Sequence, residues 1–254
     1  MKSDKLENSF YKDIENKQFK IAILPWGATE AHNYHLPYGT DTFLAEELSK
    51  RAIEIANKKG AKSILLPSIA YGVNSGHLDI PLCMNITPST QLSILRDIIY
   101  VLEYQNIDKL VIVNGHGGNS FKPLIKELNI EYPDTLIATI DWWKICEGSD
   151  YFENPGDHAG ELETSSMSYL FPDRVQALDL AGEGKIHNFK IDALNSGWAY
   201  IPRKWPLTTD DTGVGDPSKS TPIKGEAFVK CCVDKLAKFV IDFSKIKCEE
   251  DLYE

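Results

Sequence analysis

The chain lacks several features that mark familiar classes of protein. It has five cysteines in 254 residues and no Cys-x-x-Cys pair, so neither a disulfide framework nor a thiolate zinc site is expected. Apolar runs such as Ile21 to Trp26 are far shorter than the roughly 18–20 residues of a membrane span. Residues 1–20 lack the apolar stretch of about 7–15 residues that a signal peptide needs. We therefore expect a cytoplasmic protein in a reducing compartment, without membrane contact.

Positive charge is also scarce. Thirty-seven acidic against 27 basic side chains give a net charge of −10, and no cluster of Lys and Arg is visible, which argues against nucleic-acid binding. The 43% hydrophobic and 25% charged residues are typical of a globular protein and exclude collagen, coiled coil and wholesale disorder. We expect a single domain over residues 1–254 that acts on a small-molecule substrate.

Short β-branched runs alternate with longer helical patterns along most of the chain. Because strands joined by helical crossovers must run parallel, this rhythm predicts a three-layer α/β/α sandwich with a mostly parallel central sheet. The expected strands are Phe19–Leu24, Ser63–Pro67, Lys109–Val113 and Thr135–Ile140, and the expected helices are Asp41–Lys59, Pro88–Gln105, Asn119–Tyr132 and Glu226–Lys245.

From Leu178 to Ile223 this pattern dissolves, which predicts a long loop region over residues 181–223. Loops of this length inside a compact domain are usually functional or contact another subunit. A mobile surface insertion is the alternative.

Five of the six histidines lie in Gly-, Pro- or Asp-rich segments at expected element ends. Open parallel sheets bind ligands in the crevice at the carboxyl ends of their strands. In the first such segment, Glu30 and His32 follow a strand and Asp41 begins the next helix. Asp41 by itself is more simply a helix N-cap than a metal ligand. Carboxylate and imidazole together, however, suit a divalent ion.

The second and third segments offer the same chemistry. His116 lies in a Gly-rich stretch whose spacing fits neither a dinucleotide fingerprint nor a Walker A loop, so a phosphate cradle is the less favoured alternative. His158 precedes Glu161 and Glu163 at another helix start, which offers a ligand plus a general acid or base. Positions 161 and 163 differ by about 200° around a helix. The sequence therefore leaves open which glutamate faces the site.

In this order, the three segments resemble the creatininase (creatinine amidohydrolase) family. Gly27 to Asp41 is similar to the family's Gly-Ser-x-Glu-Gln-His-Gly-Pro-His-Leu-Pro…Asp motif. Asn114 to Asn119 resembles its Asn-Gly-His-Gly-Gly-Asn motif, and His158 to Ser165 its His-Ala-Gly-x-x-Glu-Thr-Ser motif. A weaker likeness at Gly213 to Pro217 extends the resemblance over nearly the whole chain.

The resemblance implies a site with two divalent ions. It implies that Asp41 bridges them, that Glu30 and His116 bind one ion, and that His32 binds the other. It also places Glu163 at the catalytic centre and makes His158 a group that contacts substrate or transfers protons. Zn²⁺, Mn²⁺ and Fe²⁺ all suit such ligands. The family further implies a homo-oligomer, often a hexamer.

Two departures from the family pattern concern the metal and the substrate. Gly118 stands where creatininases carry an acidic ligand, and we hypothesise that Glu163 substitutes for it. Leu82 and Cys83, shortly after His77, replace the family's Gly-Thr at the edge of the site. This replacement argues against creatinine itself as the substrate.

These patterns predict a metal-dependent hydrolase of a small non-peptide amide or formamide, expected to be cyclic, that uses a metal-activated water. His158 and Glu163 are the predicted catalytic residues, and His77, Trp142, Trp143 and His158 are the predicted substrate contacts. Trp142 with Trp143, or Trp198 with Trp205 in the long loop, are placed to wall a ring-shaped substrate. The simpler alternative is that these tryptophans lie in the core or at an interface. The alternatives are hydrolysis of an oxidised inositol or lactone ring, and a binding protein that keeps the fold without turnover.

Overall fold

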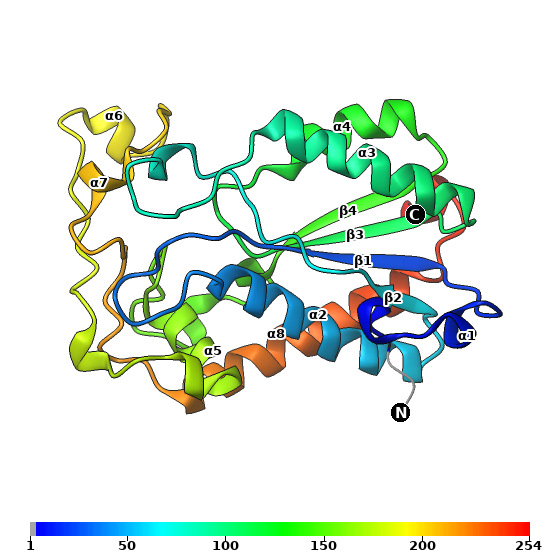
Figure 1. The fold of residues 1–254 in the computed structure, drawn as a ribbon, viewed down its shortest axis with the longest axis horizontal. Helices are drawn as coiled ribbons and strands as arrows, with labels where there is room; N and C mark the ends of the chain where they lie inside the picture. The colour runs from blue at the N-terminus through cyan, green and yellow to red at the C-terminus, as the bar shows by residue number, and fades with distance from the viewer. Residues whose placement is uncertain (1–3) are drawn as a thin grey trace.

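A four-stranded parallel sheet lies between two layers of helices in the computed structural model, which describes residues 4–254 (Figure 1). The strands are β1 (Ile21–Trp26), β2 (Ser63–Leu65), β3 (Lys109–Asn114) and β4 (Leu136–Asp141), in the order β2-β1-β3-β4. Every neighbouring pair is parallel. The predicted three-layer sandwich is therefore confirmed.

Helices cover both faces of the sheet. One face carries α2 (Thr40–Lys58), α5 (Glu161–Leu170) and α8 (Pro222–Phe243), and the other carries α3 (Pro88–Tyr104) and α4 (Phe121–Glu131) (Figure 1). Helix α8 begins before the predicted Glu226 because Pro222 is its first residue and the Thr221 side chain accepts a hydrogen bond from the Lys224 amide. The small helix α1 (Tyr11–Ile14) precedes β1.

Strand β1 shows why the sheet could be recognised from sequence. Ile21 and Ile23 join the core beneath α2, α5 and α8, whereas Ala22, Leu24 and Trp26 join the core beneath α3 and α4. All six residues are buried. A strand buried on both faces has a nearly continuous apolar sequence, and such a run between polar segments predicts a central parallel strand.

The predicted loop region at residues 181–223 ends at Thr221, because α8 begins at Pro222, and it is irregular apart from the short helices α6 (Asp192–Asn195) and α7 (Trp205–Thr208). Hydrogen bonds attach it to the segment after β1. The Asn33 side chain donates to the Gly182 carbonyl at 3.1 Å and accepts from the Gly182 amide at 2.8 Å. The amide of Val214 donates to the His158 carbonyl at 2.8 Å. The loop is thus held next to the segments that carry the predicted site residues.

The structure corrects the prediction drawn from the cysteines. Cys146 and Cys231 form a disulfide, with their Cα atoms 6.6 Å apart and a separation of 85 positions in the sequence. They meet because the segment after β4 packs against α8, a contact that cysteine spacing cannot reveal. The disulfide removes the cysteine argument for a reducing compartment.

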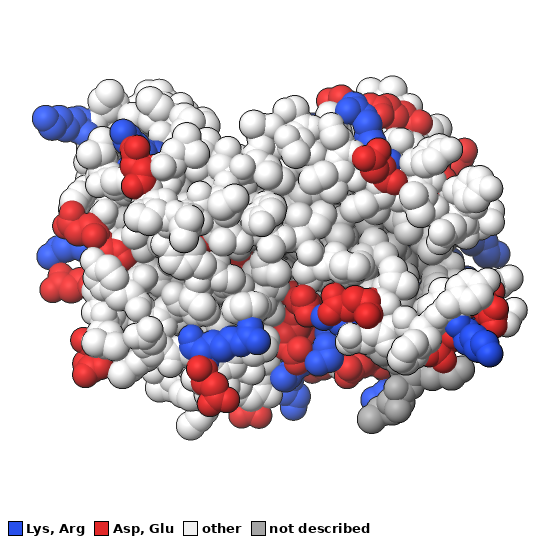
Figure 2. All heavy atoms as spheres, viewed as in Figure 1, with Lys and Arg blue, Asp and Glu red and all other residues white. Residues whose placement is uncertain are grey.

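On the face drawn in Figure 2, charged side chains of both signs lie along the left and right margins, at the upper right and in a cluster below the middle. Uncharged residues occupy most of the middle of this face. Within residues 4–254, no helix is both long enough and apolar enough to cross a bilayer.

Candidate active site

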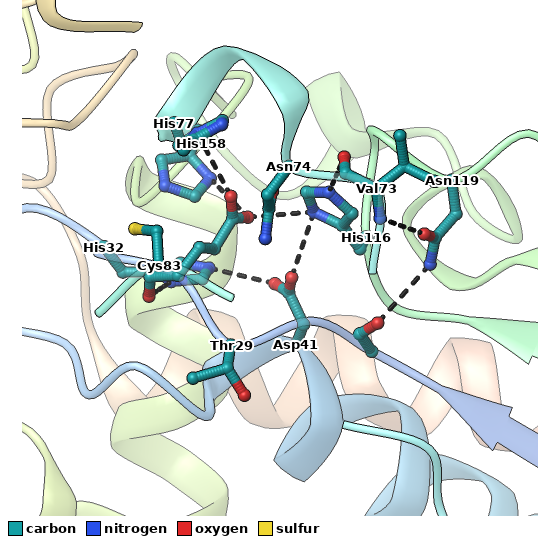
Figure 3. Close-up of polar contacts among 12 residues, drawn as sticks. Thr29, His32, Asp41, Val73, Asn74, His77, Cys83, His116, Asn119 and His158 are labelled. Atoms are coloured by element: carbon teal, nitrogen blue, oxygen red, sulfur yellow. Dashed lines mark hydrogen bonds and ion pairs between the residues drawn. The ribbon is translucent and has the colours of Figure 1, made fainter. Parts of the chain in front are cut away.

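Carboxylates and imidazoles from three distant segments meet where β1 and β3 end (Figure 3). The loop between β1 and α2 supplies Glu30 and His32, and the first turn of α2 supplies Asp41. The loop after β3 supplies His116. The third segment supplies His158 and Glu163. Parallel strands bring their carboxyl ends to one edge of the sheet, so these loops converge although the sequence separates them widely.

Glu30, Asp41 and His116 form one group. His116 Nδ1 lies 2.9 Å from Glu30 Oε1 and 3.2 Å from Asp41 Oδ2 (Figure 3). All three side chains are buried, with at most 5% of each residue exposed. One ligand atom from each lies within 4.8 Å of the others, a spacing that a single divalent ion can bridge.

His32, Asp41 and Glu163 form a second group, in which one ligand atom from each residue also lies within 4.8 Å of the others. His32 Nε2 lies 2.9 Å from Asp41 Oδ1, the carboxylate oxygen that the first group does not use. Asp41 therefore presents one oxygen to each group. The two groups are the arrangement that a pair of ions sharing one carboxylate would need.

The imidazoles of His116 and His32 are each oriented by a backbone carbonyl. His116 Nε2 lies 3.1 Å from the Val73 carbonyl, and His32 Nδ1 lies 3.0 Å from the Glu30 carbonyl. A carbonyl only accepts hydrogen bonds, so each of these nitrogens carries the proton. In the neutral ring, the opposite nitrogen then presents its lone pair to the carboxylates, as a metal-binding histidine requires.

The buried charges shift one another's pKa values. Burial alone would lower the pKa of His32, but the charge and hydrogen bond of Asp41, together with the charges of Glu163 and Glu30, raise that pKa to about 10. Burial opposes a raised pKa at His116 as well, yet Glu30 and Asp41 raise it well above its ordinary value. Burial favours protonated Glu30, but His116 and His158 hold its pKa well below the usual range. Two protonated imidazoles thus balance the carboxylates at neutral pH, a role that divalent cations could take over.

Two carboxylate oxygens support the fit of a cation. Glu30 Oε2 and Asp41 Oδ2 are buried, and among residues 4–254 neither has a partner with hydrogen-bond geometry. His77 Nε2 and His116 Nδ1 approach them to 3.2 Å without that geometry. Leaving a buried charged oxygen without a hydrogen bond is costly, and a bound cation would remove that cost. The residues present therefore suit divalent metal ions.

Two questions left open by the sequence are answered by the geometry. Gly39, not Asp41, is the N-cap of α2, so capping does not account for Asp41. Glu163 faces the site, whereas Glu161 points away from it, pairs with Lys224 and accepts from the Asn154 amide at 2.9 Å.

Gly118 cannot be replaced by a ligand without rearrangement. A Cβ atom there would lie 2.4 Å from both His116 Nε2 and the Val73 carbonyl oxygen. The hydrogen bond between those two atoms therefore occupies the space that a side chain at position 118 would need.

Two cavities open beside the carboxylates. The narrower one, of about 70 Å³, is bordered by Trp143, Pro155, Leu162 and Glu163. The wider one, of about 250 Å³, is bordered by His77, Tyr200, Arg203 and Trp205. Both cavities share a common wall that consists of Glu30, Gly117, Asp157 and His158. Together they are at the small end of ligand pockets, which span about 300–1,000 Å³.

The structure separates the predicted aromatic contacts. Trp142 is fully buried in the core against Phe228, with ring centroids 6.0 Å apart, so its prediction as a substrate contact is wrong. Trp143 borders the narrow cavity and Trp205 the wide one, whereas Trp198 is 80% exposed. A run of two tryptophans after a strand does not show which one enters the core.

Arg203 was missed by the sequence analysis. It borders the wide cavity from the irregular loop, where no periodic pattern indicates which side chains point inward. The only feature of the sequence that could have pointed to Arg203 was its position two residues before Trp205.

Comparison with known proteins gives these features a family context. The creatinine amidohydrolase family model matches residues 7–240. The chain belongs to the creatininase family. It is 28% identical to a mycofactocin precursor peptide peptidase of Mycobacterium ulcerans (85% of this chain and 84% of the relative). It is also 28% identical to a 3-dehydro-scyllo-inosose hydrolase of Thermotoga maritima (89% and 78%) and 27% identical to a creatinine amidohydrolase of Pseudomonas putida (85% and 87%).

Solved structures show the same creatininase fold. A candidate creatinine amidohydrolase from Bacteroides fragilis is 40% identical, covers 100% of both chains and superimposes with a TM-score of 0.93. Creatininase structures described as Zn–Zn type and as the Mn form are 22% identical, each with a TM-score of 0.79. They cover 96% and 95% of this chain and 99% of their own. The chain is thus a hydrolase of the creatininase family with candidate metal-binding groups.

Proposed function

We propose that the protein is a two-metal hydrolase of a small non-peptide amide or formamide, of cyclic type. The observation that carries the proposal is the position of Asp41, one of whose oxygens approaches His32 and the other His116, so that it belongs to two of the groups of potential ligands. Glu30 and His116 would hold one ion with Asp41, and His32 and Glu163 the other. Zinc and manganese are supported by the forms of the related creatininase structures, and iron(II) suits the same donors.

The bound ions would supply an activated water, because a water's pKa drops from 15.7 towards about 7 at such a centre, and would polarise the substrate carbonyl. This chemistry answers the main obstacle to amide hydrolysis, the scarcity of hydroxide at neutral pH. The role of the chain is to hold the ligands rigidly and to exclude bulk water. Burial of Glu30, Asp41 and His116 fits that role.

His158 is placed to move the proton. Its Nε2 donates to the Ala31 carbonyl at 2.8 Å, so in the neutral ring Nδ1 is the acceptor, and Nδ1 lies 3.6 Å from Glu30 Oε1. His158 borders both cavities. Its Nδ1 could take a proton from the attacking water and return it to the leaving nitrogen, a contribution of roughly 10²–10⁴-fold.

The remaining predicted residues have defined places in this proposal. Glu163 takes the ligand role that Gly118 cannot fill, and its carboxylate accepts from the Ala159 amide at 2.6 Å. Trp143 and His77 would contact the substrate from opposite cavities. Burial lowers the pKa of His77 to about 4, so at neutral pH it would act as an uncharged hydrogen-bonding ring.

A second candidate is hydrolysis of an oxidised inositol ring or a lactone. The match to a 3-dehydro-scyllo-inosose hydrolase over 249 residues favours it, because that substrate is a small ring. The same metal-activated water would serve either reaction. We also propose that the protein is cytoplasmic and forms a homo-oligomer, with a hexamer as the expected form. Light scattering of the purified protein tests the assembly.

A metal-controlled activity screen tests the proposal. The protein is stripped with a chelator, reloaded with Zn²⁺ or Mn²⁺, and assayed against cyclic amides, formamides, lactones and inososes. We expect at least one class to be hydrolysed by the reloaded protein and none by the stripped protein. Turnover that is indifferent to metal removal contradicts the proposal. A loaded protein that turns over no member of the panel supports a binding protein instead.

A further inference from the structure

One wall of the wide cavity is a stack of three side chains. The Trp205 ring stacks on His77, with centroids 4.6 Å apart, and the Arg203 guanidinium carbon lies 4.7 Å from the Trp205 ring centroid. Trp205 Nε1 donates to the Thr212 carbonyl at 3.0 Å, which fixes the ring. A Cβ atom at Gly76 would lie 2.1 Å from the Arg203 carbonyl oxygen, so the backbone at Arg203 sits directly against this turn. The wall is therefore held in place on both sides.

Arg203 is paired with Asp157 at the cavity surface. Arg203 Nη2 donates to Asp157 Oδ2 at 2.8 Å, and both residues border the cavity that contains Glu30, His116 and His158. A guanidinium has five N–H donors and a carboxylate has about four acceptor positions. Their mutual hydrogen bond uses one of each. The pair thus retains donors and acceptors that a bound molecule can use.

The charge of this pair decides what it can recognise. Asp157 offsets the positive charge of Arg203, so an anionic substrate would meet a carboxylate beside the guanidinium and gain little attraction. A neutral group that both donates and accepts hydrogen bonds matches the pair better. Two adjacent hydroxyl groups do this, because one can donate to the carboxylate while the other accepts from the guanidinium.

Stability does not explain the pair. The side chains of Arg203 and Asp157 are 35% and 58% exposed, and ion pairs this exposed to solvent contribute little to folding. The same exposure leaves both side chains accessible at the edge of the cavity that they border.

We propose that the Arg203–Asp157 pair binds a vicinal diol of the substrate and so determines specificity. The inference rests on the proposed function for the reaction, but the binding it describes can be measured without turnover. A polyhydroxylated ring and a ribosyl group are the two sources of this chemistry. Creatinine carries no hydroxyl group and would leave the pair unused.

Calorimetric titration of the metal-loaded protein tests this recognition. The probes are myo-inositol and D-ribose as diols, cyclohexanol as a ring without a diol, and cyclohexanecarboxylate as an anion. We expect at least one diol to bind tenfold or more tightly than cyclohexanol, since hydrogen bonds to charged groups discriminate at this level. Binding of myo-inositol alone identifies the ring, and binding of ribose alone identifies the ribosyl group. Equal binding of cyclohexanol, or tighter binding of the carboxylate that Arg203→Ala weakens, overturns the proposal.

Variants locate the binding. Arg203→Ala, Arg203→Lys and Asp157→Asn should each weaken diol binding by about tenfold or more, because each removes part of the matched donor and acceptor set. Arg96→Ala is the control, since Arg96 makes a comparable pair with Glu131 on the helices α3 and α4. Melting temperatures of all variants should stay close to that of the parent. Folded Arg203 and Asp157 variants with unchanged affinity refute the assignment.

The outcomes also separate this inference from the proposed function. Diol binding that depends on Arg203, without hydrolysis by the metal-loaded protein, supports the recognition and contradicts the reaction. Metal-dependent hydrolysis of a substrate without hydroxyl groups, unaffected by Arg203→Ala, supports the reaction and contradicts the recognition.

Discussion

Replacing Asp41 with asparagine should remove more function than any other single change at the site. Asp41 is 1% exposed, and its oxygens lie 2.9 Å from His32 Nε2 and 3.2 Å from His116 Nδ1. Asparagine keeps one oxygen and loses the charge, so it cannot serve both groups of ligands. The substitution is nearly isosteric, which keeps packing effects small.

The size of the effect follows from the burial. Removing one partner from a buried charged pair costs about 3–5 kcal/mol. At about 1.4 kcal/mol per factor of ten, metal affinity should fall by roughly 10²–10³-fold or more. His158→Asn should leave metal content unchanged and cost roughly 10²–10⁴-fold in activity, because it removes a proton carrier and keeps the ligands. Asp41→Asn should cost more.

Elemental analysis and calorimetry of the stripped and reloaded proteins measure these differences. Asp97→Asn is the matched control, because Asp97 is an exposed aspartate on α3. Circular dichroism verifies that each variant is folded. If Asp41→Asn binds both ions with the parent affinity, or if both variants retain parent activity, the reasoning about a shared carboxylate is refuted.

Three other predictions concern the same region. Glu163→Gln should lose the ion on the His32 side. Glu161→Gln should keep the metal content and lose about 1–3 kcal/mol of stability, since Glu161 pairs with Lys224. Elemental analysis and urea unfolding distinguish the two variants. Trp142→Ala should lose about 3–5 kcal/mol of stability as a core residue, and Trp143→Ala should instead raise KM. In the metal-free protein the pKa of His32 is raised from 6.5 to about 10, so its stabilisation is complete below pH 6.5 and should be lost as the pH rises towards 10. Urea unfolding across that range checks the sign, and rising stability would contradict it.

Most of the sheet could be predicted because burial on both faces leaves a direct trace in the sequence. The run Ile21–Trp26 is apolar for the physical reason that two layers of helices cover it. The Cys146–Cys231 disulfide left no such trace, because it depends on how the segment after β4 packs against α8.

The site, like the fold, has residues that the sequence could locate and residues that it could not. Motifs at the strand ends located Glu30, His32, Asp41 and His116, since parallel strands necessarily bring these ends together. Direction around a helix or turn was not predictable. Helix geometry alone left Glu161 and Glu163 open, and only the family resemblance favoured Glu163, which lies beside His32 and Asp41. Trp142 was expected at the substrate, but it lies in the core.

The irregular loop was the least predictable part. Arg203 reaches the cavity only through tertiary contacts, including the close approach of its carbonyl oxygen to Gly76. No repeating pattern in the loop marks it as an inward-facing residue. Substrate recognition therefore has to be argued from the structure.

Anomalous X-ray diffraction from crystals of the zinc-loaded protein tests the central claim most directly. The account predicts two peaks per chain at the zinc absorption edge, one on each side of the Asp41 carboxylate. A single peak, or peaks remote from Asp41, would contradict it.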